Sequence, residues 1–342
     1  MKGPKVTVAG AGALGLSAAL ALADAGCRVS VCDPDPDASA SAVAAGMLAP
    51  VFEAALDPQA APAFDLLLAA RDLWPGLEAR AGLALDRSGA MAVGLEGWLS
   101  GLDAALVRLG VRPIELPRRT AEALAPGLSP EFAGARLVRE DWRLEARATL
   151  AGLRRAADAA GVAFARSAVR QVGDADWLVV ATGAGRGLLD LAPELDRLSP
   201  IKGQIARYAG RPAGRVSVRG QGTYVVPAGE GLAVGATMEA GRADARPDPA
   251  ALAQTLRTAA RLFPGLEAAP FDVAAGVRAA SPDGLPLVGF SRTPKVIVAA
   301  GARRNGWLLA PLIARMVAAC ATGGDMGPHT RRFAPARFEG AG

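Results

Sequence analysis

The sequence feature that most restricts the fold is a glycine-rich hexapeptide at 10–15, GAGALG, which fits the pattern G-x-G-x-x-G. It follows a short β-branched run at 5–9 and leads into an alanine- and leucine-rich stretch at 14–25 that ends at Gly26. This order predicts a buried strand, a tight turn and a helix closed by a glycine. A second strand is predicted at 28–33, so the chain opens with a βαβ unit.

Each glycine of the hexapeptide has a separate physical role. Gly10 permits the tight turn, Gly12 lets the backbone approach a pyrophosphate, and Gly15 allows the helix to pack closely on the strand. The helix N-terminus offers unpaired N–H groups to that anion. Asp33, at the end of the second strand, can accept from ribose hydroxyls and disfavours a 2′-phosphate. A glycine turn that only caps a helix is the alternative, and strand, helix and acid together argue against it. The pattern predicts a dinucleotide site without choosing between NAD and FAD.

The length of 342 residues predicts about two domains. Hydrophobic residues make up 51% of the chain, enough for a sizeable core. Further buried strands at 177–183 and 295–301, and a helix at 306–321, extend the dinucleotide-binding part. Between them, short strands predict a meandering, largely antiparallel sheet, with helices near 98–110 and 249–262; these strands lie at 90–95, 204–208, 216–219, 223–226 and 232–236.

The predicted fold class is therefore α/β (α+β), a Rossmann-type domain with a mainly antiparallel-sheet substrate domain inserted. We expect a discontinuous cofactor-binding domain and a substrate-binding domain. The first comprises 1–83, 140–196 and 271–342, and the second comprises 84–139 and 197–270.

Composition excludes several classes of function. The net charge of +5 comes from scattered Lys and Arg, and aromatics are only 5%, so we expect no nucleic-acid partner. No run of eighteen apolar residues is free of charges and helix breakers, so no membrane span is expected. The three cysteines form no disulfide framework, and a soluble, cytoplasmic protein is expected. Homo-oligomerisation is left open.

Several segments, in order along the chain, resemble glycine oxidase and the wider D-amino-acid oxidase family. The stretch 39–50, followed by Glu53, is similar to the family's second flavin-contacting loop. The stretch 276–286 fits G-x-R-x-x-x-x-D-G-x-P, and 299–311 resembles the closing glycine oxidase signature; shorter matches lie at 202–204, 224–227 and 235–238. The resemblance runs from residue 5 to about 322 and implies FAD as the cofactor. No cysteine lies between residues 33 and 319, so we expect FAD to be bound non-covalently.

Oxidation of an amino acid requires that its carboxylate be anchored, and an arginine does this with two parallel hydrogen bonds. Arg278 is the candidate; the alternative is a surface arginine paired with Asp283. The resemblance adds Tyr224 as a donor to the same carboxylate, Arg304 near the substrate and Met238 in the pocket wall. The alternatives are packing for Tyr224 and Met238 and a surface position for Arg304.

The motif and the resemblance together imply a set of cofactor-binding residues. They are Gly10, Gly12, Ala13, Leu14, Gly15, Asp33, Pro34, Ala40, Ser41, Ala45, Gly46, Met47, Val169, Ala302, Arg303, Arg304, Asn305, Gly306, Trp307 and Leu308.

The only histidine, His329, lies near the C-terminus, which argues against a histidine base, a Ser-His-Asp triad and a metal site. Transfer of the α-hydrogen as hydride needs no strong base once the amine is neutral. The leading expectation is oxidation of a small amino acid, such as glycine, sarcosine or a small D-amino acid, with O₂ as acceptor. The products are a 2-oxo acid, ammonia and hydrogen peroxide, and the family context implies thiamin biosynthesis. A D-amino-acid oxidase or dehydrogenase is the runner-up. Two further classes stay open, an NAD-linked dehydrogenase and a non-enzymatic flavin-binding protein.

Overall fold

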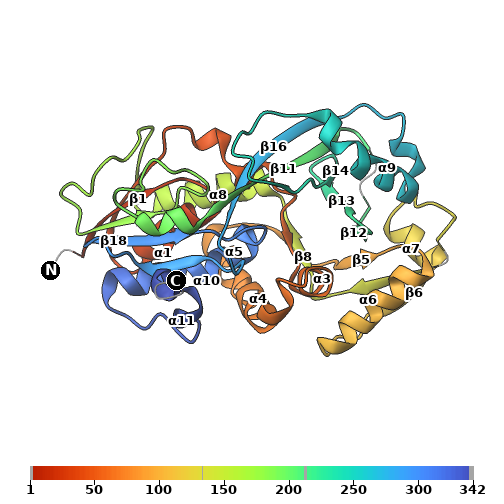
Figure 1. The fold of residues 1–342 in the computed structure, drawn as a ribbon, viewed down its shortest axis with the longest axis horizontal. Helices are drawn as coiled ribbons and strands as arrows, with labels where there is room; N and C mark the ends of the chain where they lie inside the picture. The colour runs from red at the N-terminus through yellow and green to blue at the C-terminus, as the bar shows by residue number, and fades with distance from the viewer. Residues whose placement is uncertain (1–2, 133, 212–213, 339–342) are drawn as a thin grey trace.

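The computed structural model describes residues 3–132, 134–211 and 214–338. Two main β-sheets lie side by side along the long axis, each with its own helices (Figure 1). The first sheet has the order β17-β18-β10-β1-β2-β9, and all its neighbours are parallel except β17 and β18. Its strands are β1 (Lys5–Ala9), β2 (Arg28–Cys32), β9 (Ala163–Ala165), β10 (Trp177–Val180), β17 (Leu287–Phe290) and β18 (Val296–Ala300).

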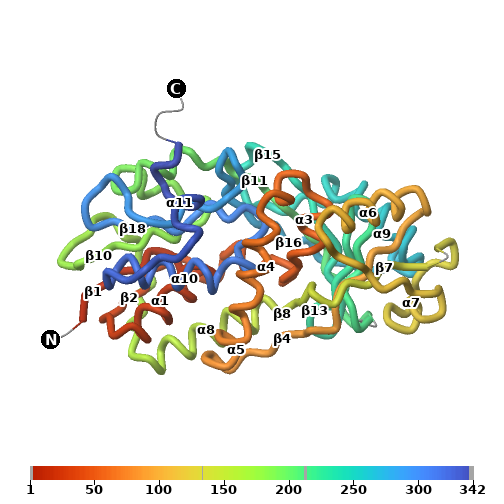
Figure 2. Tube along the Cα trace, turned by 90° about the horizontal axis from the view of Figure 1, so that it is seen from below, coloured from red at the N-terminus to blue at the C-terminus, as the bar shows by residue number. Residues whose placement is uncertain are grey.

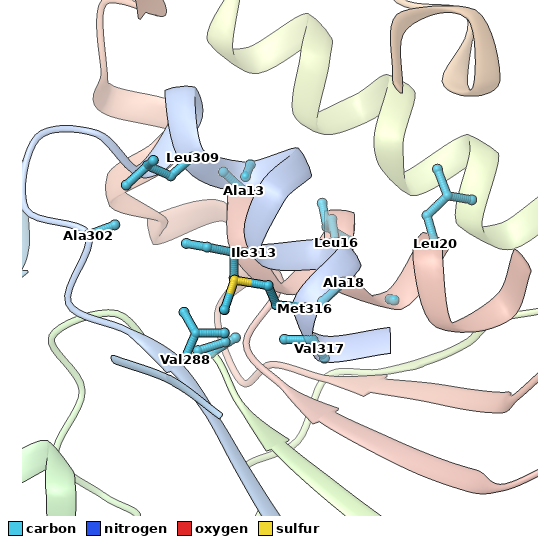
Figure 3. Close-up of a cluster of buried hydrophobic side chains, with 14 of the residues drawn as sticks. Ala13, Leu16, Ala18, Leu20, Val288, Ala302, Leu309, Ile313, Met316 and Val317 are labelled. Atoms are coloured by element: carbon cyan, nitrogen blue, oxygen red, sulfur yellow. The ribbon is translucent and has the colours of Figure 1, made fainter. Parts of the chain in front are cut away.

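The predicted βαβ opening is confirmed to within one residue. Helix α1 (Ala13–Asp24) follows the glycine turn and packs beside α10 (Gly306–Thr322) on one face of the first sheet. Figure 3 shows Leu16 of α1 and Ile313 and Val317 of α10 converging in this layer. Both faces of β10 and β18 are buried, so their sequences are continuous apolar runs, whereas β1 and β2 alternate valine with threonine or serine.

The second sheet is larger and mostly antiparallel, as predicted; β5 and β12 are its parallel pair. Its order is β15-β11-β14-β13-β12-β5-β7-β6, with β16 on the other side of β11. The strands are β5 (Ala90–Ala92), β6 (Ile114–Pro117), β7 (Gly134–Val138), β11 (Ser199–Tyr208), β12 (Ser217–Gly220), β13 (Thr223–Ala228), β14 (Gly231–Gly235), β15 (Glu239–Ala240) and β16 (Asp272–Ala280).

Helices cover both faces of the second sheet. Residues of β5 alternate between them: Ala90 and Ala92 pack with α6 (Glu96–Arg108), whereas Met91 packs in the core that includes α9 (Ala253–Leu262). In Figure 2, α6, α7 and α9 gather at the end of the molecule opposite α1 and α10. Other helices are α2 (Ala40–Val43), α3 (Pro50–Leu56), α4 (Phe64–Asp72), α5 (Trp74–Ala81), α7 (Arg118–Leu124), α8 (Ala146–Ala159) and α11 (Thr330–Phe333).

A small third sheet has the order β3-β8-β4 and lies between the two larger ones (Figure 1). Its strands are β3 (Met47–Leu48), β8 (Trp142–Leu144) and β4 (Leu85–Asp86). Short 3₁₀ turns occupy Pro36–Ala38, Ala61–Ala63, Pro193–Arg197, Pro249–Leu252, Pro264–Leu266 and Pro335–Phe338.

Some predicted boundaries were wrong. The strand at 90–95 ends at Ala92, because Leu95 already caps helix α6, which begins two residues earlier than predicted. The strand at 204–208 begins at Ser199. The predicted helix at 249–262 is a 3₁₀ turn followed by α9, since Pro249 supplies only the first turn.

A long antiparallel pairing in the second sheet ends where the chain crosses to the first sheet. Strand β11 pairs with β16 over nine residues, from Ser199 opposite Ala280 to Arg207 opposite Asp272. The chain then continues from β16 into β17 of the first sheet. The strands of the first sheet fall within the ranges predicted for the cofactor domain, whereas β16 falls in its last range yet belongs to the second sheet. The domain boundaries stay a prediction. Among the described residues no helix combines the length and apolarity needed to cross a membrane.

Replacing Gly15 with alanine tests the close packing of α1 against the turn. A Cβ at Gly15 would lie 1.9 Å from the backbone oxygen of Gly10, so the helix must shift. We expect a loss of about 1–3 kcal/mol in the free energy of unfolding, measured by urea denaturation. Gly101→Ala in α6 is the control, because no atom lies within 4 Å of its added Cβ. That variant should gain about 0.5–1 kcal/mol. An unchanged midpoint for Gly15→Ala would contradict the packing role.

Candidate functional site

A long cleft runs along the carboxyl ends of β1 and β2. One cavity of about 460 Å³ is lined by the glycine turn, Asp33, the 181–185 loop and the 301–304 loop. An adjoining cavity of about 410 Å³ is lined by Asp33, Pro34 and Val169. Gly12 faces the larger cavity, while Gly10, at φ +110°, touches the backbone of Ala181 too closely for a side chain. The turn therefore offers bare backbone to a ligand at the N-terminus of α1, as a pyrophosphate requires.

Asp33 organises the glycine turn as well as facing both cavities. Its Oδ2 accepts from the Ala11 N–H at 2.7 Å, and its Oδ1 accepts from the Asp35 N–H at 2.9 Å. Each carboxylate oxygen has a second acceptor site, so the same group can also accept from ribose hydroxyls. Asp33 thus fixes the turn and presents negative charge beside it.

The 39–47 segment closes the cleft from the opposite side. The Ser41 hydroxyl accepts from the Ala13 N–H at 3.0 Å, and the Ser41 carbonyl accepts from Trp307 Nε1 at 3.1 Å. These bonds tie the segment to the starts of α1 and α10 together. The three stretches predicted to contact the cofactor, which are far apart in sequence, therefore meet at one place.

Most of the predicted cofactor residues line these cavities or the substrate cavity described below. Gly15 and Leu308 line none of the three: Gly15 packs beneath the turn, and Leu308 is 1% exposed in the core. The lining residues are Gly10, Gly12, Ala13, Leu14, Asp33, Pro34, Ala40, Ser41, Ala45, Gly46, Met47, Val169, Ala302, Arg303, Arg304, Asn305, Gly306 and Trp307.

Asp33→Asn removes the charge at the turn with a side chain of the same size, and one of the two accepting oxygens becomes an NH₂ donor. We expect FAD to bind more weakly by about 1–3 kcal/mol, the range for a charge-assisted hydrogen bond, in a titration of the apoprotein. Asp37→Asn is the matched control, because Asp37 is exposed and pairs only with the exposed Arg166 among the described residues. Equal FAD affinity in wild type and Asp33→Asn would reduce Asp33 to a structural role in the turn.

A third cavity, of about 410 Å³, lies between the second sheet, the 40–56 segment and the start of α10. The four residues predicted to bind substrate, Arg278, Arg304, Tyr224 and Met238, all line it. Ala45, Gly46 and Met47 line it as well, so it adjoins the predicted cofactor residues. Their assignment to substrate and cofactor stays a prediction, and the fold places them together.

Arg278 lies across β11 because residue 203 is glycine. A Cβ at Gly203 would lie 2.0 Å from Arg278 Nη1, so any side chain there would displace the guanidinium. Arg278 Nη1 donates to the Thr237 carbonyl and contacts Met238 Sδ, each at 3.4 Å. These are long, weak contacts. No carboxylate among the described residues forms an ion pair with Arg278, and burial lowers the pKa of its guanidinium.

The alternative expectation, that Arg278 pairs with Asp283, is wrong. Asp283 is occupied by Arg337, whose Nε and Nη2 donate to its two oxygens at 2.8 and 2.9 Å. Arg278 instead faces the cavity with Tyr224, whose hydroxyl lies over Gly235; a Cβ there would be 2.6 Å from it. Burial raises the pKa of Tyr224, so its phenol stays a proton donor at neutral pH. Arg278 and Tyr224 together offer a planar guanidinium and a hydroxyl group as hydrogen-bond donors to an anion.

The charge of Arg304 is balanced by two carboxylates, Glu53 in α3 and Asp57 directly after that helix. Its Nη2 lies 2.7 Å from Glu53 Oε1 and 3.0 Å from Asp57 Oδ2, and Asp57 also pairs with Arg303. Burial lowers the pKa of Arg304, but the charges of Glu53 and Asp57 outweigh it and raise the pKa overall. Two arginines and two carboxylates thus form a compact, neutral network at the start of α10.

Sequence reasoning missed Arg219, which lines the same cavity. The signal was present in the hairpin 217–228: Arg219 pairs across the strands with Tyr224, so the two side chains share one face. Phe52 and Trp98, also missed, form an apolar wall of the cavity. Their signal is weak, because aromatic residues on helices are more often core.

Comparisons with known proteins cover most of the chain. A family model described as DAO, FAD dependent oxidoreductase, matches residues 5–320. The chain is 31% identical to the bifunctional protein ThiO/ThiG of Synechocystis sp., over 65% of this chain and 37% of that protein. It is 34% identical to the tRNA 5-methylaminomethyl-2-thiouridine biosynthesis bifunctional protein MnmC of Caulobacter vibrioides, over 63% and 32%. The chain spans about a third of the length of these two relatives.

A solved structure extends the similarity to the whole fold. The glycine oxidase from Geobacillus kaustophilus superposes with a TM-score of 0.83 at 26% identity, covering 98% of this chain and 99% of that one.

Proposed function

Because the chain belongs to the DAO family of FAD dependent oxidoreductases, we propose that it oxidises a small amino acid at the carbon that carries the amine. The proposed reaction converts amino acid, O₂ and water to a 2-oxo acid, ammonia and hydrogen peroxide. Glycine, sarcosine and small D-amino acids are the proposed substrates. The observation that carries the proposal is Arg278, a half-buried guanidinium without an ion-pair partner among the described residues, beside Tyr224.

The residues of the cavity account for binding and orientation. Arg278 presents a planar fork that matches a carboxylate, and the Tyr224 hydroxyl donates to the same group. The apolar side chains of Phe52 and Trp98 exclude water from the part of the cavity that they line. Anchoring one end of the substrate fixes the direction of its α-hydrogen, which is the orientation that this chemistry needs.

FAD, held by the glycine turn, Asp33 and the 39–47 and 302–307 segments, would supply the acceptor for the hydride. The cavity offers no histidine to take a proton, and none is required if the substrate binds with a neutral amine. The nearby Glu53 is bound to Arg304, and Asn305 Nδ2 donates to it at 3.4 Å. We propose that Glu53 positions Arg304 rather than acting as the base.

The pathway, compartment and oligomeric state belong to the proposal in the same way. The similarity to a ThiO/ThiG protein supports a place in thiamin biosynthesis. The cytoplasm is supported by Cys27, Cys32 and Cys320, which are all free thiols. The predicted domain ranges and site residues complete the proposal. An oxidase or dehydrogenase with another amine substrate is the second candidate, favoured by the similarity to MnmC.

The mode of FAD attachment is directly testable. Purified protein should be yellow, and acid precipitation should release all the flavin as FAD into the supernatant. The physical reason is that none of the three cysteines lines the substrate cavity, so no thiol is placed to tether the flavin there. Flavin that stays with the precipitated chain would disprove non-covalent binding.

Arg278→Lys tests the carboxylate anchor. A lysine keeps the charge but cannot form the two parallel hydrogen bonds of a guanidinium. We therefore expect kcat/KM for amino acids to fall by an amount that corresponds to about 2–5 kcal/mol of lost transition-state stabilisation. FAD content and melting temperature should stay near wild type. Arg337→Lys is the control, because that arginine serves Asp283 outside the cavity.

A second comparison separates carboxylate binding from general damage. An amine without a carboxylate should be a poor substrate of the wild type and should lose little more in Arg278→Lys. If the variant strips FAD or keeps full amino-acid oxidation, the anchor lies elsewhere, and Arg304 is the next residue to test.

A further inference from the structure

Arg219 is a second cation in the substrate cavity that the proposed reaction does not use. It lies in β12, opposite Tyr224 of β13, and its guanidinium carbon is 5.8 Å from the centroid of the tyrosine ring. Its Nε is buried and has no hydrogen-bond partner among the described residues. No carboxylate in the described part of the chain forms an ion pair with Arg219. A buried donor without a partner is costly, so its presence in a ligand cavity needs an explanation.

The charges around the cavity do not balance without a ligand. Arg303 and Arg304 are matched by Glu53 and Asp57. Arg278 and Arg219 are left, each without an ion-pair partner in the described residues. Their burial lowers the pKa of both guanidinium groups, as expected for cations that lack close compensation. The cavity therefore carries an excess of positive charge.

Glu53 and then Asp141 act on Arg219 through their charges, but neither forms an ion pair with it among the described residues: Glu53 pairs with Arg304, and Asp141 binds backbone groups. The two oxygens of Asp141 accept from the backbone N–H groups of Val51 and Phe52, at 2.8 and 3.0 Å, which fixes the start of α3. Asp141 does not line the cavity, and burial raises the pKa of its carboxyl to about 7. Asp141 therefore fixes helix α3, which carries Glu53, and the guanidinium of Arg219 is free to bind an anion.

The two unmatched arginines approach the cavity from opposite sides of Tyr224. Arg219 and Tyr224 belong to one row across the sheet, which continues through Gly235 and Ile205 to β16. That row reaches β16 at Ala274, whereas Arg278 lies four residues, or about 13 Å, further along β16, which is itself four strand spacings or about 19 Å from β12. Both arginine side chains are long and both line the same cavity, so the distance between their guanidinium groups is shorter than the distance between their backbones. Gly235, which has no side chain, lets the Tyr224 hydroxyl lie over it in the cavity.

We propose that Arg219 binds a second anionic group of the substrate, so that the substrate class is amino acids with two carboxylates. One carboxylate binds Arg278, and the other, on the side chain or on the amine substituent, extends past Tyr224 to Arg219. This inference rests on the proposed function, since it assumes that Arg278 holds the first carboxylate. The alternative is that Arg219 serves only as a cation stacked on the ring of Tyr224.

The test compares substrates that differ only in the second charge. Peroxide release, with a dye acceptor in parallel, gives kcat/KM for D-aspartate against D-asparagine and for D-glutamate against D-glutamine. The wild type should prefer the acid over the amide by tenfold or more. Arg219→Gln should bring this ratio close to one, and Arg219→Lys should keep part of it. N-(2-carboxyethyl)glycine compared with sarcosine shows whether the second carboxylate is instead carried on the amine; preference for either acid supports the proposal.

A binding measurement keeps the inference separate from the proposed oxidation. Succinate and glutarate should raise the melting temperature of the holoenzyme more than acetate does, and Arg219→Gln should abolish the difference. If no amino acid is oxidised but this difference is present, the proposed function fails and the second anion site stands. Arg257→Gln, on the exposed face of α9, controls for loss of one surface charge and should match wild type. No preference for the dicarboxylic member in any of the three pairs, or an equal loss for both members of a preferred pair in Arg219→Gln, overturns the proposal.

Discussion

The pairing of β11 with β16 is the constraint on which the site depends. It lies in the second sheet, just before the chain crosses to the first, and its register sets Gly276 opposite Gly203 and Arg278 opposite Ile201. A slip by one residue would turn Arg278 to the other face of the sheet, since side chains alternate along a strand. The glycine at 203 then gives the guanidinium a place to lie. A single ladder thus connects the dinucleotide cleft to the residue proposed to hold the substrate.

Electrostatics divides the arginines of the site into two kinds. Arg303 and Arg304 are held by acids in and just after α3, and that helix is in turn fixed at its start by Asp141. Such a network fixes side-chain positions without leaving net charge. Among the described residues Arg278 has only long hydrogen-bond contacts, and Arg219 has the ring of Tyr224 but no partner for its Nε, so both can bind a ligand. Burial makes each of these cations a stronger binder of an anion than the same group in water.

The sequence predicts local structure here better than it predicts side-chain partners. The βαβ opening follows from glycine, helix and strand signals within about thirty residues, and the antiparallel strands follow from Gly- and Pro-bounded apolar runs. Helix α8 was not predicted, although its run of Ala, Leu and Arg before Gly161 carries a helix signal; the first half of β16, which is rich in alanine, has little β-branched or aromatic signal. The pairing of Arg304 with Glu53 spans 251 positions and has no local signal. Arg219 could have been predicted, because the hairpin register alone sets it opposite Tyr224.

The first sheet takes its strands from both ends of the chain. Strand β10 lies between β1 and β18, and helix α1 depends on α10 to cover its apolar side. During synthesis, α1 emerges from the ribosome almost three hundred residues before α10 does. Strands β9 and β10 can pair with β2 and β1 once they are made, but until β18 and α10 follow, the nascent N-terminal sheet exposes the free edge of β10 and a bare face of α1, both prone to aggregation. Its survival in the cell should therefore rely on chaperone binding during translation more than that of a protein whose domains are contiguous.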